Sequence, residues 1–135
     1  MNGSVVHAYS LAKDGNVQLT ANFKVREFAC KDGSDPIFIS SGLVSVLQQI
    51  RSFFKKPVTI TSAYRTASHN KREGGSAQSQ HLYGMAADIV VEGVAPLVVA
   101  EYADSLLPGT GGIIVYPKRG FVHIDVRKQK YRATE

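Results

Sequence analysis

Residues 79–88 of the chain read Ser-Gln-His-Leu-Tyr-Gly-Met-Ala-Ala-Asp. The histidine, His81, stands in a polar segment, and Asp88 follows seven residues later inside the apolar run Met85–Val91. A carboxylate in a buried strand suffers a large desolvation penalty unless a cation or several hydrogen-bond donors meet it. A metal ion supplies the cation, and an imidazole that leaves a loop beside that strand can share it. We therefore treat His81 and Asp88 as candidate metal ligands.

A second pair of candidate residues stands near the C-terminus, in the apolar run Phe121–Val126. His123 and Asp125 are two positions apart, so a strand would project both side chains from one face. Two imidazoles and a carboxylate form a ligand set of catalytic zinc, which keeps its fourth position for water. The residues alone do not exclude structural roles for the two aspartates. An arginine can neutralise Asp88, and Asp125 can be a salt-bridge partner.

The hydrophobic pattern around these motifs predicts helices that alternate with strands. Apolar residues recur every three or four positions from Ser40 to Phe54, which indicates an amphipathic helix capped by Ser40 or Ser41. The other expected elements are strands at 58–62, 85–91, 113–116 and 121–126, a helix at 96–107, and a polar loop with room for one helical turn at 64–84. This order predicts an α+β fold, with helices packed on one face of a small, mostly antiparallel sheet.

The length of the chain, 135 residues, fits a single domain. We divide it into an N-terminal arm of about residues 1–35, a catalytic core of about 36–127 and a solvated basic tail, 128–135. Three apolar residues are expected to pin the arm onto the core: Phe23, Val25 and Phe28.

Composition narrows the function classes. The single cysteine, Cys30, excludes an intramolecular disulfide, and no stretch is long and apolar enough to span a membrane. The formal net charge of +5 favours polyanionic partners, among them the acidic polymers of a bacterial wall. Nucleic acid is not expected as the partner, because aromatic and basic residues do not interleave. The first residues, Met1–His7, lack the basic start and apolar run of a signal peptide.

Four segments together resemble one known family. The pattern Ser79-x-His81-x-x-Gly84-x-Ala86-x-Asp88 resembles the zinc signature of the D-alanyl-D-alanine carboxypeptidase and dipeptidase family, which has phage endolysin relatives. Three further segments are similar to the family's strand end with its substrate-facing arginine, its second metal motif and its N-terminal arm: Thr61–Thr66, Phe121–Arg127 and Asn22–Cys30.

The resemblance implies a fold with the zinc site in a cleft on the sheet, as in the D-Ala-D-Ala carboxypeptidases and hedgehog proteins. It implies that His81, Asp88 and His123 bind zinc. It also implies that Arg65 and Ser79 bind substrate or support the residues that do.

The chain departs from two of the family's patterns for the general base. Some members carry a glutamate three residues before the last histidine ligand, where this chain has Gly120, and others carry a histidine two residues before it, where this chain has Phe121. Asp125 is the first candidate for the base, because it shares a strand face with His123, and Glu73 is the second. The alternative role for Asp125 is to orient a ligand histidine or an arginine.

These features predict a monomeric zinc metallopeptidase that hydrolyses peptidoglycan stem peptides, most simply as a D-alanyl-D-alanine carboxypeptidase. The alternatives are an L-alanyl-D-glutamate endopeptidase of the phage endolysin type and a non-catalytic, zinc-stabilised module that binds the cell wall. Without a signal peptide, the expected route is synthesis in the cytoplasm and action on the wall after release, as for a phage or prophage product.

Overall fold

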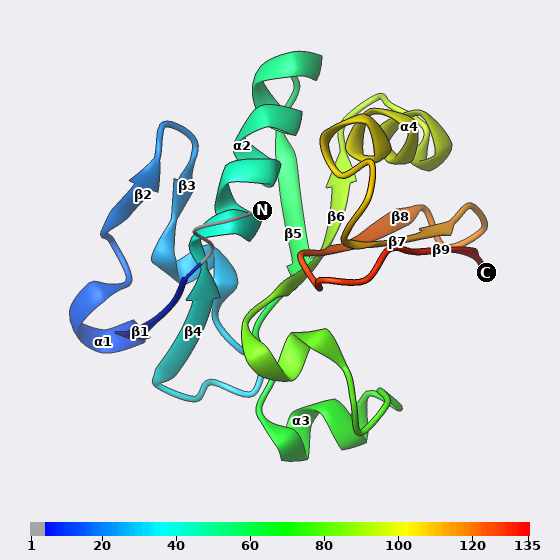
Figure 1. Cartoon of the computed structure of the whole chain (residues 1–135). Helices are drawn as coiled ribbons and strands as arrows, with labels where there is room; N and C mark the ends of the chain where they lie inside the picture. Colours follow the sequence, from blue (N-terminus) through cyan, green and yellow to red (C-terminus); the bar gives the residue numbers. More distant parts are fainter. Residues whose placement is uncertain (1–4) are drawn as a thin grey trace.

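The computed structural model describes residues 5–135 and forms an α+β domain built on one central sheet (Figure 1). The stretch Met1–Ser4, part of the segment inspected for a signal peptide, lies outside the described residues. The elements in chain order are β1 (Val6–Ser10), α1 (Leu11–Asp14), β2 (Gln18–Thr20), β3 (Phe23–Lys24), η1 (Val25–Phe28), β4 (Pro36–Ser40), α2 (Ser41–Phe54), β5 (Val58–Ser62), α3 (Ala67–Arg72), η2 (Gln80–Tyr83), β6 (Ala86–Val91), α4 (Pro96–Leu106), β7 (Gly112–Tyr116), β8 (Phe121–Asp125) and β9 (Tyr131–Thr134).

The central sheet has the strand order β5-β6-β8-β7-β9. Its first four strands are antiparallel to their neighbours, whereas β9 pairs with β7 in parallel. The register of β6 and β8 places Asp88 opposite His123 and Ala86 opposite Asp125. The expected mostly antiparallel sheet is therefore confirmed, and its central strand pair carries three of the candidate site residues.

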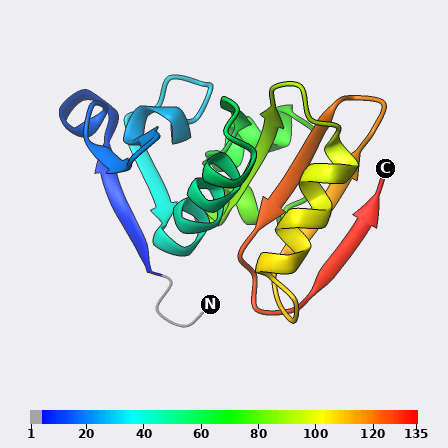
Figure 2. The same ribbon diagram turned by 90° about the horizontal axis from the view of Figure 1, so that it is seen from above.

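The two long helices cover one face of this sheet and contact each other (Figure 2). Helix α2 begins where the Ser40 side chain accepts a hydrogen bond from the Leu43 amide, so the predicted cap and helix are confirmed. Pro96 stands at the start of α4, as expected. Both helices bury their apolar sides in the core, against alternate residues of the sheet such as Ile89 and Ile124. The short helix α3 lies on the other side of the sheet, beside the candidate site (Figure 1).

The N-terminal arm is packed more closely into the domain than a simple extension would be. β1 pairs with β4 over its whole length, from Val6 opposite Ser40 to Ser10 opposite Pro36. The three residues expected to pin the arm are all buried: Phe23, Val25 and Phe28.

Two expectations about local structure need correction. The segment 64–84, expected to be a loop with room for one helical turn, holds two such turns, α3 and the 3-10 helix η2, which Thr66 and Ser79 cap with their hydroxyls. The supposed solvated tail contains the edge strand β9, which Arg132 ties to the carbonyls of Leu107 and Gly111. Backbone pairing and caps therefore order polar segments whose composition is typical of loops.

Among residues 5–135, no helix has the length and apolar character that a membrane crossing requires.

Candidate metal centre and cleft

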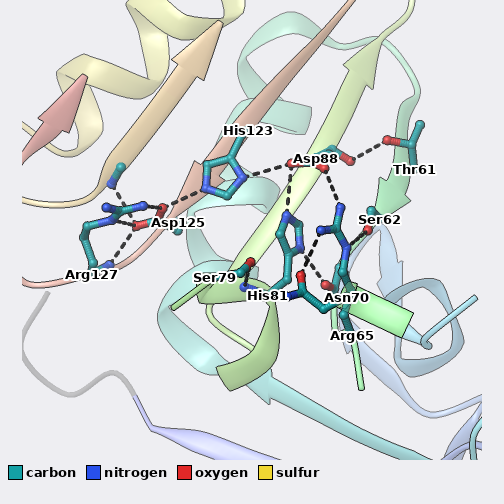
Figure 3. Close-up of polar contacts among 12 residues, drawn as sticks. Thr61, Ser62, Arg65, Asn70, Ser79, His81, Asp88, His123, Asp125 and Arg127 are labelled. Atoms are coloured by element: carbon teal, nitrogen blue, oxygen red, sulfur yellow. Dashed lines mark hydrogen bonds and ion pairs between the residues drawn. The ribbon is translucent and has the colours of Figure 1, made fainter. Parts of the chain in front are cut away.

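Three elements bring the predicted ligands together on the sheet face opposite α2 and α4 (Figure 3). His81 comes from η2, Asp88 from β6 and His123 from β8, and one donor atom of each lies within 4.8 Å of the others. The Asp88 Oδ1 atom is 3.3 Å from His81 Nε2 and 3.0 Å from His123 Nδ1. All three residues are buried.

The local sequence around His81 explains how a loop residue reaches the sheet. Ser79 accepts a hydrogen bond from the His81 amide and so starts the 3-10 turn. Gly84 ends the turn in the left-handed region at φ 70°, where a side chain would collide with the Phe38 carbonyl. The His81 carbonyl accepts a hydrogen bond from the Arg65 amide, which closes the loop onto the end of β5.

The hydrogen bond of His81 to the backbone determines its tautomer. Nδ1 lies 2.6 Å from the Ala63 carbonyl oxygen, which can only accept, so Nδ1 carries the proton. In the neutral ring, Nε2 then carries a lone pair, which is directed at the Asp88 carboxylate, another acceptor. Two acceptors at this distance require a cation or a proton between them.

His123 is held in the same way by a carboxylate. Its Nε2 donates to Asp125 Oδ2 at 2.7 Å, which leaves Nδ1 directed at Asp88. Asp125 is fully buried and accepts four further hydrogen bonds, from the Gly112 amide and from the backbone and guanidinium of Arg127. Both oxygens of Asp125 are therefore occupied in positioning neighbours.

The pKa values of the buried groups reflect this pairing. Burial opposes ionisation of His123, but its hydrogen bonds to Asp125 and Asp88 raise its pKa to about 9. Burial raises the pKa of Asp88, but the adjacent imidazoles of His123 and His81 outweigh it and hold that pKa well below the usual range. Asp125 follows the same pattern: burial is outweighed by hydrogen bonds from Arg127 and His123, and its pKa is lowered. A protonated His123 lies between the two carboxylates, and Arg65 beside Asp88 and Arg127 beside Asp125 supply further positive charge.

The donor set fits a zinc ion. Two imidazoles and one carboxylate leave a fourth position for water or substrate, as in catalytic zinc sites. Zinc-binding histidines usually donate their other N–H to a carbonyl or a carboxylate, and His81 and His123 do so to Ala63 and Asp125. The residues present therefore satisfy both the ligand set and the outer hydrogen bonds of such a site.

Arg65 lies beside the donor cluster, three residues after the end of β5 (Figure 3). Its guanidinium is 3.5 Å from Asp88 Oδ2 and donates to Ser62 and to Asn70. Gly75 passes so close to Asn70 Oδ1 that a Cβ at this position would overlap it. The arginine predicted to face substrate is thus fixed by side chains from three segments.

The donor cluster opens into a cleft of about 600 Å³. One wall is formed by the loop 73–80, and the other by β7, β8 and the residues around β9. Three arginines line it, Arg65, Arg119 and Arg127, together with the carboxylates Asp88, Glu73 and Glu135. Asp125 does not line the cleft.

The sequence made Asp125 the first candidate for the general base. Its surroundings instead fit the alternative role, which is to orient a ligand histidine or an arginine. A carboxylate with no exposed surface and five hydrogen bonds does not reach a water molecule in the cleft. Glu73, the second candidate, is exposed at the cleft wall. The Ser79 hydroxyl accepts a hydrogen bond from the backbone amide of His81, and Ser79 also lines the cleft.

Sequence reasoning missed three residues that build the site. Asn70 is buried and connects Arg65 to the Ser76 carbonyl. Gly75 and Gly112 leave space for Asn70 and Asp125 respectively. The Gly74-Gly75 pair was a visible signal of close backbone approach, whereas nothing in the local sequence marks Gly112.

Comparison with known proteins agrees with this geometry. The chain is 33% identical over 94 residues to the peptidoglycan L,D-endopeptidase MepK of Escherichia coli K12, and equally to MepK of Shigella flexneri. These alignments cover 64% of this chain and 50% of each relative, so the chain spans about half the length of the curated relatives it matches. Residues 17–125 match the Peptidase M15 family, a range that includes the donor cluster, Arg65 and Asp125. The chain belongs to the Peptidase M15 family.

Proposed function

We propose that this chain is a zinc-dependent peptidase that cleaves a peptide bond in peptidoglycan stem peptides. The observation that carries the proposal is the convergence of His81, Asp88 and His123 at a cleft, with the outer nitrogen of each histidine already held. A purely structural ion pair does not need this arrangement, because Arg65 alone could neutralise Asp88.

The assignment of the metal follows from the donors. His81 Nε2, an oxygen of Asp88 and His123 Nδ1 would hold the ion. A zinc ion in such a site polarises a carbonyl and lowers the pKa of bound water.

The chain's own residues supply orientation, charge and a proton acceptor. Asp125 and Arg127 hold the His123 ring in the tautomer that presents Nδ1 to the cleft. Glu73 is the proposed proton acceptor, because it is the exposed carboxylate of the loop that leads into His81. The second candidate is Glu135, which lines the opposite wall of the cleft. Arg65, with its fork beside Asp88, is placed to bind a carboxylate of an anionic stem peptide.

The bond that is cut is proposed from the relatives. MepK is named an L,D-endopeptidase of peptidoglycan, which favours cleavage inside a peptide over removal of the last residue. The D-alanyl-D-alanine carboxypeptidase remains the second candidate, because a guanidinium beside the metal ligands suits a terminal carboxylate.

The experiment uses purified muropeptides with the zinc-loaded chain and identifies products by mass. An internal cut in a cross-linked or tetrapeptide substrate supports the endopeptidase, and loss of the terminal D-alanine from a pentapeptide substrate supports the D-alanyl-D-alanine carboxypeptidase. A chelator must abolish either reaction and zinc must restore it. No cleavage of any muropeptide by a fully zinc-loaded chain would overturn the peptidase and favour the cell-wall-binding module.

A further inference from the structure

A second group of metal-ligating side chains lies outside the cleft, where the N-terminal arm meets α3. Cys30, Asp32 and His69 each place one donor atom within 4.8 Å of the other two. Cys30 and Asp32 follow η1 in the arm, whereas His69 lies in the first turn of α3. Cys30 is buried, His69 half-buried and Asp32 exposed, so the group reaches from the core to solvent.

Thr66 organises this group. Its amide donates to Cys30 Sγ at 3.4 Å, and its hydroxyl donates to Asp32 Oδ2 at 2.7 Å. The same hydroxyl accepts the hydrogen bond from the His69 amide that starts α3. One residue thus holds two of the donors and positions the backbone of the third.

The surroundings of Cys30 and Asp32 suit a cation. The Asp32 carboxylate accepts hydrogen bonds from the Ser34 amide and the Thr66 hydroxyl, which fix its position. The Thr66 amide is directed at the Cys30 sulfur, and metal binding itself deprotonates a coordinating thiol. No basic residue contacts the Asp32 carboxylate within the described part of the chain.

We propose that Cys30, Asp32 and His69 form a second zinc site, which clips the N-terminal arm to α3. Thiolate, imidazole and carboxylate are the three side-chain ligands that zinc takes, and their combination does not suit calcium or magnesium. Donors on one tetrahedral zinc lie about 3.3–3.8 Å apart for zinc–ligand distances of about 2.0–2.3 Å. Side-chain rotation of the exposed Asp32 and the half-buried His69 therefore has to close only the remaining gap. The fourth ligand is solvent on the exposed side.

The position of this site gives it a structural consequence. Thr66 directly follows Arg65, and Asn70, one residue after His69, binds the Arg65 guanidinium. A cation held by the arm and α3 would therefore fix the segment that presents Arg65 to the cleft. The inference stands independently of the proposed peptidase activity, because it concerns other ligands and a separate ion.

The test exploits the single cysteine. Cobalt(II) replaces zinc in such sites, and a sulfur-to-cobalt charge-transfer absorption in the near ultraviolet can arise only from Cys30. We expect the full chain, reduced and titrated with cobalt, to bind two equivalents and to develop this absorption. Cys30→Ser and His69→Ala should each bind one equivalent and lack it. Asp88→Ala should also bind one equivalent but keep the absorption, and His7→Ala, which alters an exposed histidine, should match the parent.

The outcomes separate the two sites. A parent chain that binds one equivalent without thiolate absorption overturns the second site and leaves the peptidase proposal intact. A His69→Ala chain that keeps the full absorption overturns the three-residue assignment. Zinc should also raise the melting temperature of Asp88→Ala and leave that of Asp88→Ala combined with Cys30→Ser unchanged; equal shifts in both would contradict the clip.

Discussion

The two halves of the candidate metal centre are built by different means. The sheet half, Asp88, His123 and Asp125, is placed by the backbone register of β6 and β8. The loop half, Arg65, Ser79 and His81, is placed by side-chain caps, by the Ala63 carbonyl and by the close approach of Gly75 to Asn70. A strand pair holds its side chains through many backbone hydrogen bonds, whereas the loop half depends on a few individual contacts. We therefore expect the sheet half to govern metal binding and the loop half to govern the use of substrate, with His81 as the exception that belongs to both.

The largest effect is expected at the ligands of either half. His123→Ala in the sheet half and His81→Ala in the loop half should each abolish stoichiometric zinc and measurable peptide hydrolysis, because two remaining donors do not hold the ion. Metal analysis of the purified variants, beside activity, checks this. His7→Ala is the matched control. Full zinc occupancy in either ligand variant would remove that histidine from the site.

The next effect separates proton transfer from ligand orientation. Glu73→Gln should retain zinc and lower kcat by about 10²–10⁴-fold, the usual cost of losing a general base. Asp125→Asn should weaken zinc binding by about 10–100-fold, because the amide no longer orients His123 as the carboxylate does. At saturating zinc its kcat should largely recover.

The reverse pattern would restore Asp125 as the base. If zinc-saturated Asp125→Asn stays inactive while Glu73→Gln turns over normally, the proton acceptor lies on the sheet. If both variants are active, Glu135→Gln is the next variant to measure, since Glu135 lines the opposite wall of the cleft.

Gly112 tests the sheet half without changing a polar group. A Cβ at this position would overlap Asp125 Oδ2 and lie 2.8 Å from Arg127 Nε, so Gly112→Ala should displace the carboxylate. Zinc affinity should fall by roughly 10–100-fold, as expected when the partner of a ligand histidine is disturbed. Gly109→Ala is the control, because a Cβ there meets no atom within 4 Å. Competition with a chromophoric chelator measures both affinities, and equal values would show that the Asp125 position does not affect the metal.

The same contrast explains how much could be predicted from the sequence. The sheet half could be predicted from the sequence. Its β-branched and apolar runs indicate strands, and a period of two puts His123 and Asp125 on one face. His81 was identified as a candidate ligand through its motif. Of the two helical turns in 64–84, α3 and η2, the sequence allowed for one and placed neither, because segments this short leave no hydrophobic period. β9 was missed for a related reason. The charged residues of segment 128–135 suggest exposure to solvent, and only the pairing with β7 and the contacts of Arg132 reveal the strand.

Arg65 is expected to affect substrate rather than metal. Arg65→Ala should lower kcat/KM by roughly ten- to a hundredfold, which corresponds to about 1.5–3 kcal/mol for a charge-assisted hydrogen-bonded contact. Arg65→Lys should recover part of the loss, because an ammonium group lacks the planar fork. Zinc content should stay near that of the parent. A large drop in melting temperature with unchanged kcat/KM per folded molecule would instead make Arg65 a structural residue.

The smallest effect is expected at Asn70, which acts on substrate only through Arg65. The Asn70 amide donates to the Ser76 carbonyl at 2.8 Å, and its oxygen accepts from the Arg65 guanidinium at 3.2 Å. Asn70→Ala removes one of three contacts that hold the guanidinium, so kcat/KM should fall by roughly two- to tenfold, or about 0.5–1.5 kcal/mol. The loss should disappear in the Arg65→Ala background, because there is no longer a guanidinium to position. Asn16→Ala, at an exposed asparagine that pairs with Arg26, controls for removing an amide from an arginine elsewhere on the chain. If Asn70→Ala lowers kcat/KM equally with and without Arg65, Asn70 acts on the loop 73–80 itself, and the loop half of the site is held by its backbone more than by the arginine.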